Sequence, residues 1–393
     1  MKSSTSYQVM LKPAGSLCNL RCEYCYYHPF FDVDHDRQNT LSDKLLATFT
    51  DQYLADQPAG EVIFAWQGGE PTLCGIPFFK RAIELQRKYS PAGIEILNVI
   101  QTNATLLNED WCRFFRQHNF LVGVSIDGPP QLHDSFRKTP AGSPTYQDVI
   151  RGYQLLREHS VHTNILATVN SSNQDFPDKV YRHLTEDLEA KFIQFIPVVE
   201  KTHCNNANRT WEISTASVNP GAYGRFLTKV FDLWVKQDIG QVFVQLFDVT
   251  LGSWLEQPAG LCVFAPTCGN ALVLERDGNL YSCDHFVKDE HLLGNLDSQS
   301  LSKAVRSGKQ LSFGQAKLDL LPDECIECRF RFACNGGCPK NRFSIDFRSS
   351  KPLNYLCPAY RAFFQHTEYS MKAMASLIRQ GRSPALLMKT FQD

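Results

Sequence analysis

The first 200 residues alternate between short, β-branched strand patterns and amphipathic helix patterns, and this alternation limits the possible folds. The strand patterns are 8–12, 61–66, 94–101, 121–126, 163–169 and 191–197. The helix patterns between them are 42–57, 76–89, 108–118, 146–159 and 175–184. Such alternation predicts a parallel sheet with right-handed crossovers. Because the six strand patterns are fewer than a complete (β/α)8 barrel requires, we expect an α/β fold with a partial, open (β/α)6 TIM-like barrel.

The second half of the chain lacks this alternation. The polar stretch 200–220 predicts a loop, and 220–236 predicts an amphipathic helix. Short segments, turns and cysteines follow, and a tail near 358–387 predicts further helix. We therefore expect a barrel domain over residues 1–258 and a cysteine-rich domain over residues 259–393.

The charge balance argues against a nucleic-acid partner, because 40 Lys and Arg residues offset 41 Asp and Glu residues. No apolar run reaches the length of a membrane span, and the polar start lacks the apolar region of a signal peptide. These features predict a cytoplasmic protein with no membrane partner. Its 14 cysteines then point to metal or redox sites, because disulfides are rare in a reducing cytosol.

Three of these cysteines, Cys18, Cys22 and Cys25, have the spacing C-x3-C-x2-C and follow the first strand. Three thiolates can hold three irons of a [4Fe–4S] cluster and leave the fourth iron open to a ligand. A zinc knuckle with His28 as fourth ligand is the alternative that this spacing leaves open.

The motif, with Tyr24 before its third cysteine, resembles that of the radical S-adenosylmethionine (SAM) enzymes. In that family the open iron chelates SAM, and an electron from the cluster splits SAM to give a 5′-deoxyadenosyl radical. The strand 61–66 runs into Gly68-Gly69-Glu70, which resembles the motif that holds the SAM amino group. As an isolated pattern, the two glycines are also compatible with an ordinary turn.

Polar residues follow the next two strands. The resemblance implies that Gln101, Asn103 and Ser125 contact SAM, because such strand ends meet at the barrel mouth. Arg137 is a candidate partner of the SAM carboxylate, with a solvated loop arginine as the alternative.

Eight further cysteines between residues 262 and 357 suffice for two fully ligated [4Fe–4S] clusters. Their pattern resembles the SPASM extension of radical SAM enzymes that modify peptides and proteins. By this resemblance, the inner cluster is held by Cys262, Cys268, Cys283 and Cys338. The outer cluster is held by Cys325, Cys328, Cys334 and Cys357. A pair of zinc ribbons is the alternative, and Cys74, Cys112 and Cys204 are interpreted as ordinary thiols.

Among SPASM proteins, the segments CNLRCEYCYY, WQGGEPTL, QTNATLL, SIDGP and YSCDHF resemble those of anaerobic sulfatase-maturating enzymes. The resemblance implies oxidation of a cysteine or serine in a sulfatase Cys/Ser-x-Pro-x-Arg motif to Cα-formylglycine. The adenosyl radical removes a hydrogen atom from the substrate Cβ, a base takes the O–H or S–H proton, and the inner auxiliary cluster receives the remaining electron. The cofactors implied are three [4Fe–4S] clusters and SAM.

Asp284 is the candidate base, because it directly follows the ligand Cys283. An exposed loop aspartate is the alternative. By the same resemblance, Tyr27 and Gln67 contact the substrate peptide, or else line the barrel mouth.

Two other functions remain open. A SPASM maturase that forms thioether or carbon–carbon crosslinks often carries an N-terminal leader-binding domain, for which the position of Cys18 leaves no room upstream. A non-catalytic zinc-binding module is more remote. The expected partners are a sulfatase or other protein or peptide substrate, and a flavodoxin or ferredoxin as electron donor. The sequence does not distinguish serine from cysteine as the target.

Overall fold

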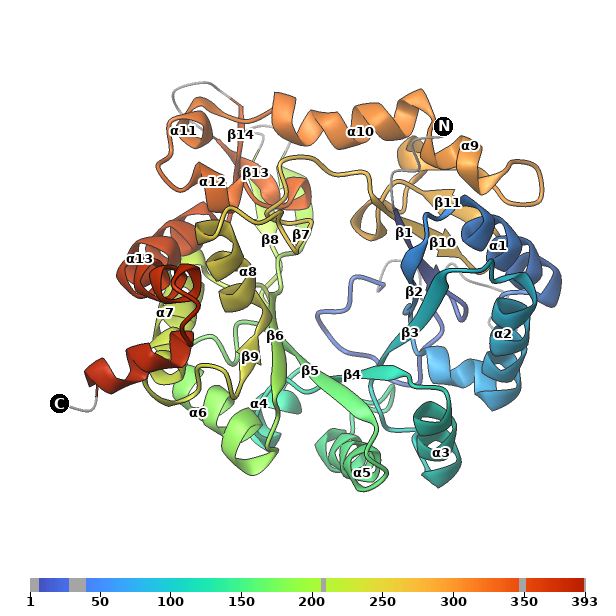
Figure 1. Ribbon diagram of the computed structural model, residues 1–393, viewed down its shortest axis with the longest axis horizontal. Helices are drawn as coiled ribbons and strands as arrows, with labels where there is room; N and C mark the ends of the chain where they lie inside the picture. The colour runs from blue at the N-terminus through green and yellow to red at the C-terminus, as the bar shows by residue number, and fades with distance from the viewer. Residues whose placement is uncertain (1–6, 28–39, 206–209, 346–350, 392–393) are drawn as a thin grey trace. The chain divides into compact units, whose positions relative to one another are not determined.

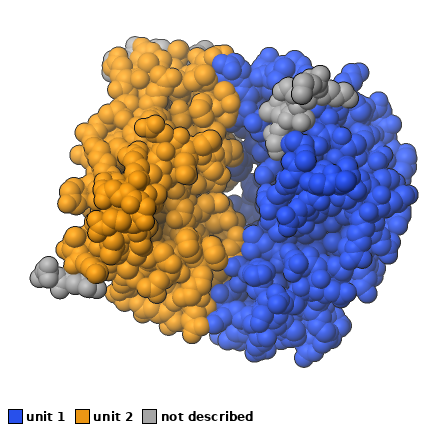
Figure 2. All heavy atoms as spheres, in the orientation of Figure 1, with its two compact units in different colours: residues 1–125, 137–163, 268–316 blue, residues 126–136, 164–267, 317–393 orange. Residues whose placement is uncertain are grey.

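A computed structural model describes residues 7–27, 40–205, 210–345 and 351–391, and it divides into two compact units (Figure 2). The first unit comprises residues 1–125, 137–163 and 268–316, and the second comprises residues 126–136, 164–267 and 317–393. His28, the possible zinc ligand, lies outside the described residues.

The first unit contains the predicted parallel strands β1 (Gln8–Lys12), β2 (Gly60–Trp66), β3 (Ile94–Thr102) and β4 (Leu121–Ser125), which pair in this order (Figure 1). Its long helices are α1 (Asp43–Asp56), α2 (Gly75–Tyr89), α3 (Glu109–Gln117) and α5 (Tyr146–Glu158). The side chains of Ser42 and Asn108 cap α1 and α3 by accepting hydrogen bonds from backbone N–H groups. The βα alternation predicted for this part of the chain is confirmed.

Part of the cysteine-rich segment extends this same sheet. Strand β10 (Ala271–Glu275) pairs in parallel with β1, and Lys12 lies opposite Glu275 in the register. Strands β11 (Asn279–Tyr281) and β12 (Leu292–Asn295) continue the sheet in antiparallel order. The sequence does not predict this addition, because the two paired segments are far apart along the chain. The sequence predicted a domain boundary between residues 258 and 259. The compact units combine separate segments of the chain and do not test this boundary, which stays a prediction.

The second unit holds most of β5 (His162–Val169), with β6 (Phe192–Pro197) and β9 (Phe243–Val244) paired in parallel. Helix α6 (Pro177–Arg182) continues into the π-helical turn η3 (His183–Asp187). The main helices are α7 (Pro220–Gln237), α8 (Gln245–Trp254) and α13 (Cys357–Arg379). Helices α7 and α13 pack closely, because a Cβ at Gly224 would lie 3.2 Å from the Cα of Ala359.

One sequence prediction needs correction, and two helices were not predicted. The stretch 200–220 contains a hairpin of β7 (Lys201–Asn205) and β8 (Thr210–Ile213), which its polar composition hid because it lacks apolar alternation. Helices α8 and α10 (Gly308–Asp319) also escaped prediction. The remaining short elements are η2 (Pro71–Cys74), α4 (Pro130–His133), η4 (Asp284–Phe286), η5 (Asp289–His291), α9 (Leu301–Val305), α11 (Asp323–Ile326), α12 (Arg331–Cys334), η6 (Pro339–Asn341), β13 (Arg342–Ile345), β14 (Pro352–Asn354) and η7 (Pro384–Phe391). Within the described ranges, no helix is long and apolar enough to cross a membrane.

Candidate active site and auxiliary cluster site

The loop that carries Cys18, Cys22 and Cys25 follows β1 in the first unit. The Leu20 N–H donates a hydrogen bond to Cys18 Sγ at 3.3 Å. Burial raises the pKa of the Cys18 thiol, and the nearby Glu70, Cys22 and Cys25 raise it further. The three predicted ligands are therefore neighbours, and a thiolate among them requires a compensating positive charge.

The glycine pair after β2 supports this cluster loop through its backbone. The N–H groups of Gly69 and Glu70 donate to the carbonyl oxygens of Gly15 and Leu17, both at 2.8 Å. A Cβ at position 69 would lie 2.1 Å from the Leu17 oxygen, which is too close for any side chain. Gly68 has a φ of 119°, a conformation that favours glycine. Glycines are needed here because the backbone after β2 lies directly against the backbone of the cluster loop. Their contacts with SAM stay a separate prediction.

Glu70 ties together the carboxyl ends of β2 and β3. Its Oε1 accepts hydrogen bonds from the backbone N–H of Thr72 at 3.0 Å and from the hydroxyls of Thr72 at 2.6 Å and Thr102 at 2.7 Å. Its Oε2 accepts from the Asn103 N–H at 2.8 Å. Burial raises the pKa of Glu70, although these donors oppose the rise. With only 1% of the residue exposed, Glu70 holds the strand ends in place, and its predicted contact with the SAM amino group stays a prediction.

The other polar residues at the strand ends also lie together. Asn103 Nδ2 donates to Asn19 Oδ1 at 2.9 Å and to Cys18 Sγ at 3.8 Å. Gln101 Nε2 donates to Ser125 Oγ at 2.9 Å. The carboxyl ends of β3 and β4 thus carry the predicted SAM contacts beside the cluster loop.

Arg137 packs against the cluster loop and is not a solvated arginine. Only 7% of the residue is exposed, and its guanidinium carbon lies 5.6 Å from the centre of the Tyr24 ring. The adjacent Lys138 forms an ion pair of 2.7 Å with Glu23 of the same loop. The alternative of an exposed arginine is therefore wrong, and a contact with the SAM carboxylate stays a prediction.

Asp284 lies in the short turn η4, in contact with Lys12 of β1 and with Tyr26 of the cluster loop. Its carboxylate forms an ion pair with Lys12, and Tyr26 Oη donates to its two oxygens at 3.3 and 3.4 Å. Its side chain is 18% exposed, so the alternative of an exposed loop aspartate is wrong. Burial opposes its ionisation, but Lys12 and His285 outweigh burial and hold the pKa of Asp284 below its ordinary value. Asp284 is therefore present in the form that accepts a proton.

Lys12, Glu275 and Tyr26 are site residues that sequence analysis missed. Lys12 Nζ lies 3.2 Å from Glu275 Oε1, in addition to its contact with Asp284. The only signal in the sequence is a lysine that ends an apolar strand.

The two predicted substrate contacts differ in exposure, since Tyr27 is buried and Gln67 is partly exposed, and their contact with substrate stays a prediction. Tyr27 is buried, and its ring stacks on that of Tyr26 with centroids 4.4 Å apart. The Gln67 N–H donates to Leu11 O at 2.8 Å, at the end of β2.

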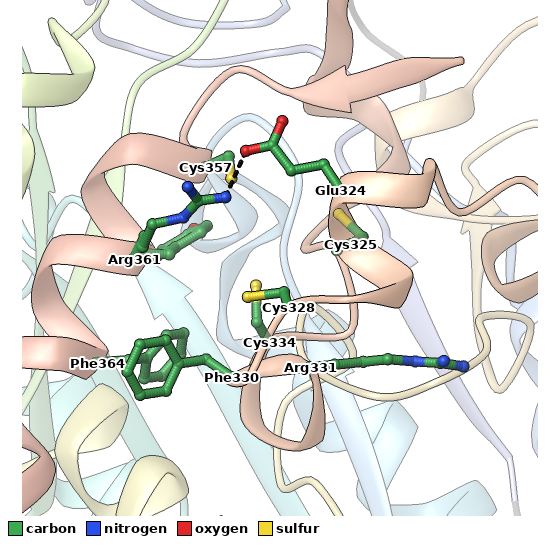
Figure 3. Close-up of a pocket in the computed structure, with 11 residues that line it drawn as sticks. Glu324, Cys325, Cys328, Phe330, Arg331, Cys334, Cys357, Arg361 and Phe364 are labelled. Atoms are coloured by element: carbon green, nitrogen blue, oxygen red, sulfur yellow. Dashed lines mark hydrogen bonds and ion pairs between the residues drawn. The ribbon is translucent and has the colours of Figure 1, made fainter. Parts of the chain in front are cut away.

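The four predicted outer ligands line one pocket in the second unit (Figure 3). Cys325 comes from α11, Cys328 from the turn after it, Cys334 from α12 and Cys357 from the start of α13. Phe330, Tyr360 and Phe364 line the same pocket, and an ion pair of Glu324 and Arg361 lies beside Cys357.

The pocket suits thiolates that are bound to metal. Burial raises the pKa of Cys325 to about 11 and that of Cys334 to about 12, and neighbouring cysteines add to both. Cys325 and Cys334 could both ionise only if a strong positive charge compensated them, as a metal centre does. Within the described ranges, no three His, Cys, Asp or Glu side chains are placed as ligands of a single metal ion.

The four predicted inner ligands divide between the units. Cys262 and Cys338 belong to the second unit. Burial raises the pKa of Cys338, and the nearby Cys262 raises it further. Cys268 and Cys283 belong to the first unit, on either side of the β10–β11 hairpin. This ligand set stays a prediction.

Among the isolated cysteines, Cys112 is buried in α3 and Cys74 precedes α2, while Cys204 lies in β7.

Comparisons with known proteins agree with this arrangement. Residues 13–178 match the family model of the radical SAM superfamily, and residues 262–329 match that of SPASM, an iron–sulfur cluster-binding domain. The serine-type anaerobic sulfatase-maturating enzyme of Bacteroides thetaiotaomicron is 43% identical, over 98% of this chain and 95% of the relative. The chain belongs to the family of anaerobic sulfatase-maturating enzymes.

Other members of this family support the fold. The cysteine-type anaerobic sulfatase-maturating enzyme of Clostridium perfringens is 34% identical, over 91% of this chain and 95% of the relative. A solved structure described as "Native anSMEcpe with bound AdoMet" is 33% identical, with a TM-score of 0.85 over 94% of this chain and 99% of that chain. The predicted fold class, an α/β radical SAM core with a SPASM domain, is confirmed. The SuiB structure from Streptococcus suis, at 13% identity and a TM-score of 0.61, shares the fold alone.

As an anaerobic sulfatase-maturating enzyme, the chain is a radical SAM oxidoreductase with [4Fe–4S] clusters and SAM as cofactors. Family membership favours iron–sulfur clusters over zinc. The neighbouring thiols of the cluster loop and the four-cysteine pocket fit this assignment, because both bring several thiols close together, as a cluster requires.

Proposed function

We propose that this enzyme oxidises a serine in a sulfatase Ser-x-Pro-x-Arg motif to Cα-formylglycine. The observation that carries the proposal is the contact of Asp284 with Tyr26, because it brings the candidate base to the loop that bears the three cluster cysteines. The relatives support serine as the target. Serine-type relatives are 37% to 43% identical to this chain, and cysteine-type relatives are 32% to 34% identical.

In the first unit, one residue accepts the substrate proton and another donates a hydrogen bond to it. When bound, SAM and its cluster supply the radical that removes a hydrogen atom from the substrate Cβ. Asp284 accepts the hydroxyl proton of the substrate serine, because its low pKa keeps it ionised. The electron that remains on the substrate would pass to the inner auxiliary cluster, which Cys262, Cys268, Cys283 and Cys338 would hold. Tyr26 keeps its own proton, since burial raises its pKa well above the ordinary value, and so it remains a hydrogen-bond donor to Asp284.

The cofactor contacts are proposed in the same way. Cys18, Cys22 and Cys25 hold the SAM cluster, and residues of the cluster loop, of the strand ends and of one later loop contact SAM. These residues are Tyr24, Gly68, Gly69, Glu70, Gln101, Asn103, Ser125 and Arg137. Tyr27 and Gln67 contact the substrate peptide. The support is their position around the cluster loop, at the carboxyl ends of β2, β3 and β4.

The partners follow from this chemistry. The substrate is a sulfatase, or a peptide segment of one, and one solved relative is described with a bound peptide. A low-potential flavodoxin or ferredoxin is the proposed electron donor, because the SAM cluster must be reduced before SAM is cleaved. The enzyme's own thiol-rich sites favour a location in the reducing cytoplasm, where free thiols persist.

Mass spectrometry of a Ser-x-Pro-x-Arg peptide and its cysteine twin, after anaerobic incubation with reconstituted enzyme, SAM and a reductant, tests the proposal. We expect the serine peptide to lose two hydrogens and form a carbonyl that reacts with hydrazine reagents. Conversion of the cysteine peptide alone would contradict the serine assignment. Two unchanged peptides, with 5′-deoxyadenosine still formed, would overturn the sulfatase-maturating function for this chain.

A further inference from the structure

We infer that Lys12 is a positioning residue that holds Asp284 in place for proton transfer, and that Glu275 in turn holds Lys12. This inference rests on the proposed function and extends it to residues to which no role has been assigned. It begins with the sheet. Parallel pairing of β1 with β10 sets Lys12 opposite Glu275, at the carboxyl ends of both strands. The hairpin that follows β10 then returns the chain, through Cys283, to place Asp284 on the same ammonium group.

The Lys12 ammonium is enclosed by the groups that would stabilise a cation. Its side chain has no solvent exposure, and it contacts the carboxylates of Glu275 and Asp284. The rings of Tyr26 and Tyr27 lie on it, with centroids 5.4 and 4.8 Å from Nζ. A lysine buried to this degree needs such partners, because an unpaired charge in the interior is strongly destabilising. One carboxylate would be enough to neutralise the charge of Lys12, so the second ion pair also fixes the position of the carboxylate that makes it.

Asp284 is held in part by residues that are distant from it along the chain. It begins η4, a single turn of 3-10 helix in which Phe286 N–H donates to Cys283 O at 3.0 Å. Its side chain is held by contacts from β1 and from the cluster loop, namely Lys12 and Tyr26. Without Lys12, the carboxylate would lose its ion pair and keep the longer contacts with Tyr26 at 3.3 and 3.4 Å. Since a displacement of about 1 Å can cost about 10²-fold in rate, loss of Lys12 should separate radical formation from product formation.

The test compares the ratio of formylglycine to 5′-deoxyadenosine formed by reconstituted enzyme on the serine peptide. We expect Lys12→Met to lower this ratio by about 10²-fold, with a fall in kcat and an unchanged KM for the peptide. Lys12→Arg should restore much of the ratio, because a guanidinium can contact both carboxylates. Lys44→Met is the matched control, since Lys44 forms an exposed ion pair with Asp297 in the same unit and should leave the ratio unchanged.

Folding is tested separately from positioning. Lys12→Met leaves two buried carboxylates facing each other, so the double variant Lys12→Met/Glu275→Gln removes a cation and an anion together. We expect this double variant to lower the ratio of formylglycine to 5′-deoxyadenosine as Lys12→Met does. Glu275→Gln alone should lower the ratio by a smaller factor, because it removes the ion pair that holds Lys12 but leaves the contact of Lys12 with Asp284. Iron content and far-ultraviolet circular dichroism confirm that each variant is folded and loaded.

Two outcomes would overturn the inference. Wild-type coupling in the folded double variant would show that Asp284 does not need Lys12. A Lys12→Met/Asp284→Asn variant that is much worse than Asp284→Asn alone would show that Lys12 acts by another route, because residues that act through one another are not additive. Neither result resembles failure of the proposed function, in which the wild-type enzyme itself yields no formylglycine.

Discussion

The two cysteine sites that the structure places within single units differ in their surroundings. The cluster loop of the first unit lies among polar and charged groups, including the buried carboxylate of Glu70 and the guanidinium of Arg137. The pocket of the second unit is lined by aromatic rings, with one ion pair at Cys357. A site that binds and activates a ligand needs polar groups around the metal, whereas a site that only holds a cluster needs burial.

The number of thiols agrees with this difference. The loop offers three, which leaves one iron open, and the pocket offers four, which close the coordination of a cluster. We therefore expect substitutions in the first site to alter SAM chemistry and those in the second site to alter stability and iron content.

The largest effect is expected for Cys22→Ala. Removal of one of three ligands leaves too few thiolates to hold the SAM cluster, so 5′-deoxyadenosine formation should fall to background. Anaerobic turnover with chromatographic detection of 5′-deoxyadenosine measures this. The comparison fails if Cys22→Ala still cleaves SAM at the wild-type rate.

Asp284→Asn should rank second, with formylglycine formation reduced by about 10²- to 10⁴-fold, the usual contribution of a general base. SAM cleavage should persist, because the substitution leaves the three cysteines in place. Peptide mass spectrometry and 5′-deoxyadenosine assays on the same samples separate the two steps. Normal formylglycine yield would remove Asp284 from the mechanism.

Cys334→Ala should affect the second unit and spare the first. With three clusters per chain, loss of the outer cluster lowers the iron content by roughly a third. The melting temperature should fall as well, since metal binding stabilises the folded state. Iron analysis, thermal unfolding and the 5′-deoxyadenosine assay check these points. Loss of SAM cleavage in a folded Cys334→Ala variant would mean that the two sites are not separable.

Gly69→Ala should have the smallest effect of the four. The added Cβ would meet the Leu17 oxygen at 2.1 Å, so the cluster loop must shift, at a cost of about 1–3 kcal/mol in unfolding free energy. Urea unfolding of the loaded enzyme measures this, and weaker SAM binding should accompany it. Gly308→Ala is the control, because a Cβ there meets nothing within 4 Å. Equal stability of both variants would contradict the backbone contact.

Features that depend on nearby residues could be predicted from the sequence. The spacing of Cys18, Cys22 and Cys25 predicts neighbouring thiols because a short loop keeps them close, and the structure agrees. Short β-branched patterns predict β1 to β6, and amphipathic patterns predict the helices between them, because each element buries its own apolar residues. The hairpin of β7 and β8 was missed for the same reason, since a polar hairpin carries no such pattern.

The sequence by itself thus determined the βα alternation and the cluster loop, and its resemblance to SPASM proteins indicated which four cysteines share the pocket. Only the tertiary structure decided that β10 joins β1, and hence that Lys12 meets both Glu275 and Asp284. Strand pairing over such a distance along the chain depends on which sheet edge is available, and local patterns do not encode that choice. The role of a buried lysine at the end of an apolar strand depends on the carboxylates that folding brings into contact with it.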